Sequence, residues 1–163
     1  MKALALLALF ATQSAPQAKP VPEVFEKLKV LVGEEWTGNV SETVTVKMKF
    51  RLDSSDREII GEGTVGDPKK PMLKIRTTMG IDPKTGEVFY LDCHNGNTVY
   101  FGKVTLVDGA IQMDFKSLTG EAGHWVSEIG SMTETGYAST LYGVGSDGKR
   151  TKMHTLEMKR ANK

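Results

Sequence analysis

From Trp36 onward, apolar and polar residues alternate with a period of two, which is typical of β-strands with one face in water. The clearest run is 43–52, where every second residue is apolar: Val44, Val46, Met48, Phe50 and Leu52. The runs 73–79 and 111–116 repeat this pattern. The alternation therefore predicts sheets with one apolar and one polar face.

Turn sequences separate these runs at short intervals. Asn95-Gly96 and Asp108-Gly109 supply the positive φ angles that tight hairpins need, and 53–56, 66–68, 82–86 and 146–148 also have turn compositions. The spacing allows roughly nine or ten strands, and no connection is long enough for a parallel crossover. We expect an all-β, closed antiparallel up-and-down barrel, because closure removes exposed strand edges; a two-sheet sandwich would satisfy the same pattern.

One short helix is predicted before the strands. Apolar residues recur at helical spacing between Val21 and Val32, and Gly33 ends the pattern. The helix would lead directly into the first strand.

The first eighteen residues differ from the rest of the chain, with Lys2 as their only charge and an apolar run from Ala3 to Ala11. This pattern is typical of a secretory signal peptide, and the run is too short for a transmembrane helix. We therefore expect residues 1–18 to be a signal peptide, residues 19–163 to form a single barrel domain, and the protein to be secreted or periplasmic.

Charge and cysteine content exclude some classes of partner. Without the leader the chain has 20 basic and 20 acidic residues, since Lys2 is the only charge removed from the totals of 21 and 20. These charges are interleaved, whereas nucleic-acid binding calls for a basic surface, so no nucleic-acid partner is expected. Cys93 is the sole cysteine, so no internal disulfide can form, and we interpret it as a small buried apolar residue.

Familiar catalytic and metal-binding motifs are absent from the sequence. The segments 61–66 and 143–148 match a glycine-rich dinucleotide pattern, but neither opens a helix, so we interpret them as hairpin glycines. No serine is flanked as in a nucleophile elbow, and no two histidines have metal-ligand spacing. The sequence therefore identifies no catalytic residue and no metal ligand.

The predicted inward positions are rich in methionine, which adapts to irregular apolar shapes. The candidate ligand-binding residues are Met48, Phe50, Met79, Met113, Phe115, His154 and Met158. A barrel of this size can hold a small ligand, although a fully packed core would show the same pattern. We predict an exported protein that binds a small apolar or amphipathic molecule; its oligomeric state stays open.

Two residues of the last strand extend this prediction. His154 shares strand parity with Leu156 and Met158, so it should point into the barrel, most simply as a hydrogen-bonded core residue. Arg160 has the same parity and should stack on Trp36 where the first and last strands meet. An enzyme is the rival hypothesis, but parity places few titratable groups inside besides His154 and Arg160.

Three segments carry a resemblance to known families. Residues 31–38, with Gly33 and Trp36 after a short helix, resemble the glycine-tryptophan opening of lipocalins and other calycins, with one additional residue between the two. That opening, together with 80–86 and 146–149, is also similar to an exported bacterial family known as domain of unknown function fifteen seventy-nine. The resemblance implies a calycin-like barrel and supplies no catalytic residue.

A second resemblance concerns haem. Nitrobindin-like haem barrels use a histidine of their last strand as axial ligand, and His154 lies in the predicted last strand. Haem, with His154 as its ligand, is therefore an alternative to a purely apolar ligand.

Overall fold

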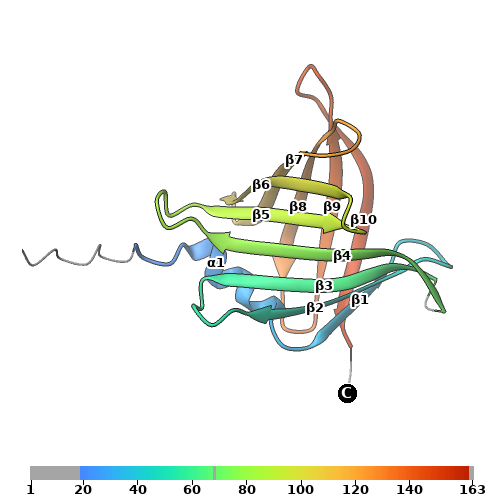
Figure 1. Ribbon diagram of the computed structural model, residues 1–163, viewed down its shortest axis with the longest axis horizontal. Helices are drawn as coiled ribbons and strands as arrows, with labels where there is room; N and C mark the ends of the chain where they lie inside the picture. The colour runs from blue at the N-terminus through green and yellow to red at the C-terminus, as the bar shows by residue number, and fades with distance from the viewer. Residues whose placement is uncertain (1–18, 68, 162–163) are drawn as a thin grey trace, which may run out of the picture.

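The computed structural model describes residues 19–67 and 69–161, and within them ten antiparallel strands close into a barrel after one short helix (Figure 1). The predicted fold class is confirmed. The predicted leader, residues 1–18, lies outside the described residues, so export stays a prediction. Within the described ranges no helix is long and apolar enough to span a membrane.

The strands follow the chain as an up-and-down meander in which each pairs with the next. Their bounds are β1 Glu35–Asn39, β2 Thr45–Leu52, β3 Glu58–Asp67, β4 Lys70–Ile81, β5 Val88–His94, β6 Thr98–Val107, β7 Ala110–Ser117, β8 His124–Met132, β9 Gly136–Val144 and β10 Arg150–Arg160. β1 also pairs with β10, and this pairing closes the barrel. In Figure 1, β2 to β5 run across the view while β8 to β10 run steeply behind them.

The predicted tight turns adopt the expected backbone. Asn95 and Gly96 have φ angles of 49° and 75°, and Asp108 and Gly109 have 50° and 82°. Two successive positive φ angles give the turn a twist that matches the twist of the flanking strands. These turns fix the register of β5 with β6 and of β6 with β7.

A helical segment packs at the barrel end where β1 begins and β10 ends. It consists of α1 (Glu23–Leu28) and a 3-10 turn (Lys29–Leu31), and its buried side chains are Val24, Phe25, Leu28 and Leu31. We call these two elements, with Trp36 and Arg160, the floor.

Trp36 and Arg160 tie the floor to the strands. The buried Trp36 donates its indole N–H to the Leu31 carbonyl at 2.8 Å. Arg160 donates to the Val30 carbonyl at 2.6 Å, and its guanidinium carbon lies 5.0 Å from the centre of the Trp36 ring. The predicted stacking of these two residues is confirmed, and with it the closure of the first strand on the last.

Several glycines lie inside strands where a Cβ would collide with neighbouring groups. Gly61 and Gly63 lie within β3, so their interpretation as hairpin glycines was wrong. A Cβ at Gly61 would lie 2.5 Å from the Phe50 ring, and one at Gly63 would lie 2.3 Å from the Met48 sulfur. The missing side chains leave room for Phe50 and Met48, and at Gly63 also for the close approach of the Lys47 carbonyl, 2.0 Å from where a Cβ would lie.

The interpretation of Cys93 as a buried core residue was also wrong. Cys93 is half-buried and lines a groove on the outer surface with residues such as Arg76, its partner across β4 and β5. Cys93, near the end of β5, therefore faces outward.

Candidate functional site

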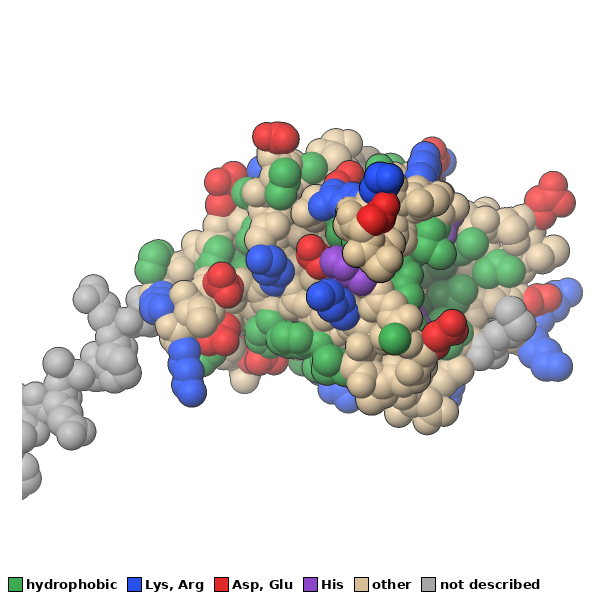
Figure 2. Space-filling view, turned by 90° about the horizontal axis from the view of Figure 1, so that it is seen from above, with side chains coloured by type: hydrophobic (Ala, Val, Ile, Leu, Met, Phe, Trp, Pro, Cys, Tyr) green, Lys and Arg blue, Asp and Glu red, His purple; other side chains and the backbone are tan. Residues whose placement is uncertain are grey.

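The barrel interior contains two adjoining compartments. The deep compartment, near the floor, has a volume of about 180 Å³, and the mouth compartment has about 370 Å³. Both are lined by Tyr90, Asp92, Met113, Ser139 and Leu156, so they adjoin across a common wall. Viewed from above, the surface is hollowed and hydrophobic side chains line the recess (Figure 2).

All seven residues predicted to bind a ligand line these compartments. Met48, Phe50, Met79 and Met158 are buried and line the deep compartment, while Phe115 and His154 line the mouth compartment. Met113 lines both. The structure therefore brings the predicted residues together around one interior space.

A polar cluster lies in the wall shared by the compartments. The carboxylate of Asp92, which is 6% exposed, accepts a hydrogen bond from the Thr77 hydroxyl at 2.7 Å and contacts Nε2 of His94 at 2.7 Å. The Tyr90 hydroxyl also interacts with Asp92. We call Thr77, Tyr90, Asp92 and His94 the carboxylate cluster.

Burial and charge perturb the ionisation of the tyrosines around this cluster. Desolvation, followed by the negative charge of Asp92, raises the pKa of Tyr90 well above its usual value. Desolvation likewise raises the pKa of Tyr137, a residue of the deep compartment. Both phenols therefore stay protonated across the physiological range and can only act as neutral hydrogen-bonding groups.

Aromatic rings form one side of the mouth compartment. Tyr100 and Trp125 pack edge to face with ring centres 5.3 Å apart, and Phe115 and Trp125 stack at 6.0 Å. The His94 ring joins this wall, with its centre 5.0 Å from that of Tyr100. The wall gives a flat or extended apolar molecule a large contact surface beside the carboxylate cluster.

His154 lies at the rim of the mouth compartment. A β-bulge between Lys152 and His154 shifts the register of β10 against β9. His154 lines the compartment but is exposed to solvent, so its expected role as a hydrogen-bonded core residue was wrong. The prediction that it faces the interior is confirmed, because it contributes to the same wall as Leu156.

The expectation that few titratable groups face the interior was also wrong, because Tyr90, Asp92 and His94 do so as well. β5 presents them inward and sends Phe89, Leu91 and Cys93 outward. From Phe89 to His94 its apolar and polar faces are thus reversed relative to those of β2 and β7. The signal that could have found them is the pair of tight turns at Asn95-Gly96 and Asp108-Gly109. These turns fix the pairing of β5 with β6 and of β6 with β7, and so carry the predicted inward parity of Met113 and Phe115 to β5.

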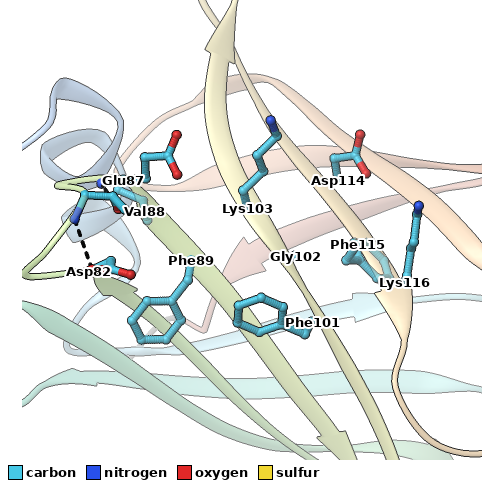
Figure 3. A pocket seen from close by; sticks show the side chains of 11 residues that line it. Asp82, Glu87, Val88, Phe89, Phe101, Gly102, Lys103, Asp114, Phe115 and Lys116 are labelled. Atoms are coloured by element: carbon cyan, nitrogen blue, oxygen red, sulfur yellow. Dashed lines mark hydrogen bonds between the residues drawn. The ribbon is translucent and has the colours of Figure 1, made fainter.

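A groove on the outer surface is the other feature near β5. Phe89 and Phe101 lie next to each other there, beside Lys103, Asp114 and Lys116 (Figure 3). Phe101 is 46% exposed, and the Phe89 ring covers Gly80. The groove is open to solvent and has no buried polar group comparable to Asp92.

Among the described residues, no group of three or more histidine, cysteine or acidic side chains is arranged to hold a metal ion. The interior instead offers one paired carboxylate, two imidazoles and several hydroxyls in an apolar surround. This arrangement can hold an amphipathic molecule and exchange a proton with it.

Comparison with known proteins supports the fold. No protein-family model matches the chain, and no curated protein matches it. The crystal structure of Rv2717c from M. tuberculosis superposes with a TM-score of 0.55 at 9% identity, covering 88% of this chain and all of that one. The barrel fits a calycin-like fold. At this level of identity the likeness extends to architecture alone.

Proposed function

We propose that this protein binds a small apolar or amphipathic molecule inside its barrel. The observation that supports this most strongly is the pair of adjoining compartments, about 180 and 370 Å³, which the seven predicted residues line. Their combined size falls within the range of small-molecule sites, which are also mostly apolar with a few placed polar groups. The proposed ligand would contact the methionines with its apolar part and the carboxylate cluster with its polar part.

A bulky side chain at the shared wall should weaken binding. Met113→Trp adds a bulky ring where the two compartments adjoin. We expect the unaltered protein to bind Nile red at one site, and the variant to bind it at least about tenfold more weakly, a change of about 1.4 kcal/mol. Fluorescence titration measures the affinity, and denaturant unfolding measures stability.

Met153→Trp is the matched control, because Met153 is 57% exposed and lines an outer groove. It should bind Nile red as the unaltered protein does. If the interior were packed, no probe would bind and Met113→Trp would instead cost about 1 to 3 kcal/mol of stability through overpacking. That outcome would refute the proposal.

Haem is the narrower alternative, and His154, the residue predicted to hold it, fits that role poorly. Histidines that bind metals commonly donate their second ring nitrogen to a carboxylate or carbonyl, which orients the ring. His154 is exposed, and no hydrogen bond holds it within the described part of the chain. Of the two imidazoles that line the compartments, His94 has such a partner in Asp92, but it lies on β5 and not on the last strand, where the resemblance places the ligand. The described residues therefore do not orient His154 as an axial ligand.

We also propose, on the sequence resemblance, that the chain is related to the exported bacterial family fifteen seventy-nine and is itself exported. These proposals rest on residues 31–38, 80–86 and 146–149 and on the leader-like composition of residues 1–18. They concern where the protein acts and leave the interior site unchanged.

A further inference from the structure

We propose that the molecule bound in the barrel is a weak organic acid, and that its acidic group is held by Nδ1 of His94. This inference rests on the proposed function and names the chemical class of its ligand. The first observation is that burying the Asp92 carboxylate costs free energy. A buried carboxylate loses hydration, and an apolar residue of similar size would usually serve the fold as well. A buried carboxylate that is paired with a histidine at a cavity wall is therefore a candidate for a functional group.

Asp92 fixes the orientation of the His94 ring. Its side chain is 8% exposed and that of His94 is 24% exposed, and both line the mouth compartment. The carboxylate accepts from Thr77 and Tyr90 as well, so these donors hold it in place. Since a carboxylate can only accept, neutral His94 carries its proton on Nε2. Nδ1 is then an acceptor with no hydrogen-bond partner among the described residues.

The remaining titratable groups around His94 favour an anion over a cation. On β5 these are Asp92 and Tyr90, on β6 Tyr100, and across the compartment His154 on β10. The inward residues of β4 that line the interior, Ile75, Thr77 and Met79, do not titrate. The one carboxylate already has three partners, whereas Nδ1 of His94 has none among the described residues. A cationic ligand would meet no free carboxylate here, but an acidic ligand meets a base.

Binding then involves the transfer of one proton. A neutral acid gives its proton to Nδ1 and remains as a carboxylate against the imidazolium N–H. An acid that is ionised in solution binds together with one proton taken from the buffer, so charge balances in both cases. The resulting imidazolium lies between the ligand carboxylate and Asp92, and both contacts are charge-assisted hydrogen bonds. An alcohol with the same chain forms only a neutral hydrogen bond.

The test compares decanoic acid with decanol by calorimetry in buffers of different ionisation enthalpy, from pH 5.5 to 8.5. Decanoate should bind at one site with uptake of up to one proton, and its affinity should fall as pH rises, by up to about tenfold per pH unit. Decanol should bind without proton uptake and with little dependence on pH. His94→Gln should remove the proton uptake and weaken decanoate about tenfold or more while decanol binding stays within about twofold.

His124→Gln is the matched control. His124 contacts Asp114 at 2.8 Å in a similar pair that lies outside the two compartments. His124→Gln should leave the affinities of decanoate and decanol unchanged. His154→Gln should keep the proton uptake that accompanies decanoate binding. Proton uptake that persists in His94→Gln would overturn the proposal, as would equal affinity and equal pH dependence of acid and alcohol in the unaltered protein. The last comparison needs no variant. If decanol binds and decanoate binds no more tightly at low pH than at high pH, this inference fails alone. If neither compound binds, the proposed function fails with it.

Discussion

Trp36→Ala should lower the free energy of unfolding by about 3 to 5 kcal/mol, the usual cost of removing a fully buried large aromatic residue. Trp36 is 0% exposed, and its ring contacts Tyr137 at 5.2 Å and the Arg160 guanidinium at 5.0 Å. The substitution also leaves the Leu31 carbonyl without its donor. Urea denaturation followed by circular dichroism measures the loss.

Replacing each of the two tryptophans by phenylalanine is the matched comparison. Trp125 is only half-buried at the mouth compartment, so Trp36→Phe should cost clearly more than Trp125→Phe. Trp36→Phe also provides a milder variant if the alanine form does not fold. Equal losses of stability at the two tryptophans would contradict the role of the floor.

Arg160→Ala should destabilise the protein as well and change the fluorescence of Trp36, because it removes the cation–π contact and the hydrogen bond to the Val30 carbonyl.

The second large effect is expected at Gly102. A Cβ at this position would lie 1.9 Å from the carbonyl oxygen of Asp114 and 2.6 Å from the Cα of Phe115. Both are backbone atoms of the neighbouring strand, so no side-chain rotation can relieve the contact. Gly102→Ala must therefore separate β6 from β7, at a cost of about 3 kcal/mol, the upper part of the range for overpacking. Thermal and urea unfolding measure the change.

Gly130→Ala is the matched control, since Gly130 also lies in a strand, is exposed, and would place its Cβ more than 4 Å from any other group. Its stability should stay within about 0.5 kcal/mol of the unaltered protein, as for most surface substitutions. Equal effects of the two alanines would mean that β6 and β7 do not approach as closely as the structure shows.

The floor and the barrel closure could be predicted because they depend on local signals. Hairpin turns set the connectivity, and the parity of β1 and β10 placed Trp36 opposite Arg160, as the strand register confirms. The methionine-rich lining was predictable for the same reason, since apolar residues alternate with charged ones along β2 and β7.

The carboxylate cluster was missed because β5 reverses the usual pattern. Hydrophobicity places Phe89, Leu91 and Cys93 inside, whereas the structure turns Tyr90, Asp92 and His94 inward. Polar groups at a cavity wall are stabilised by one another, through contacts from Thr77 and His94 to Asp92, and a binary pattern does not record such partners. Nor does sequence parity reveal whether inward side chains fill the barrel, because that depends on strand number and on the inward glycines.

If a small molecule occupies the barrel interior, the methionine methyl groups that line it should report its presence directly. In protein labelled with ¹³C at the methionine methyls, bound decanol should give intermolecular nuclear Overhauser effects to the lining residues Met48, Met79, Met113 and Met158. Met153, which is 57% exposed on the outer surface, should give none. Contacts to the interior methyls alone are the result that the structure predicts. Contacts to Met153 without any to the interior methyls, or no contacts while binding is measured, would contradict an interior site.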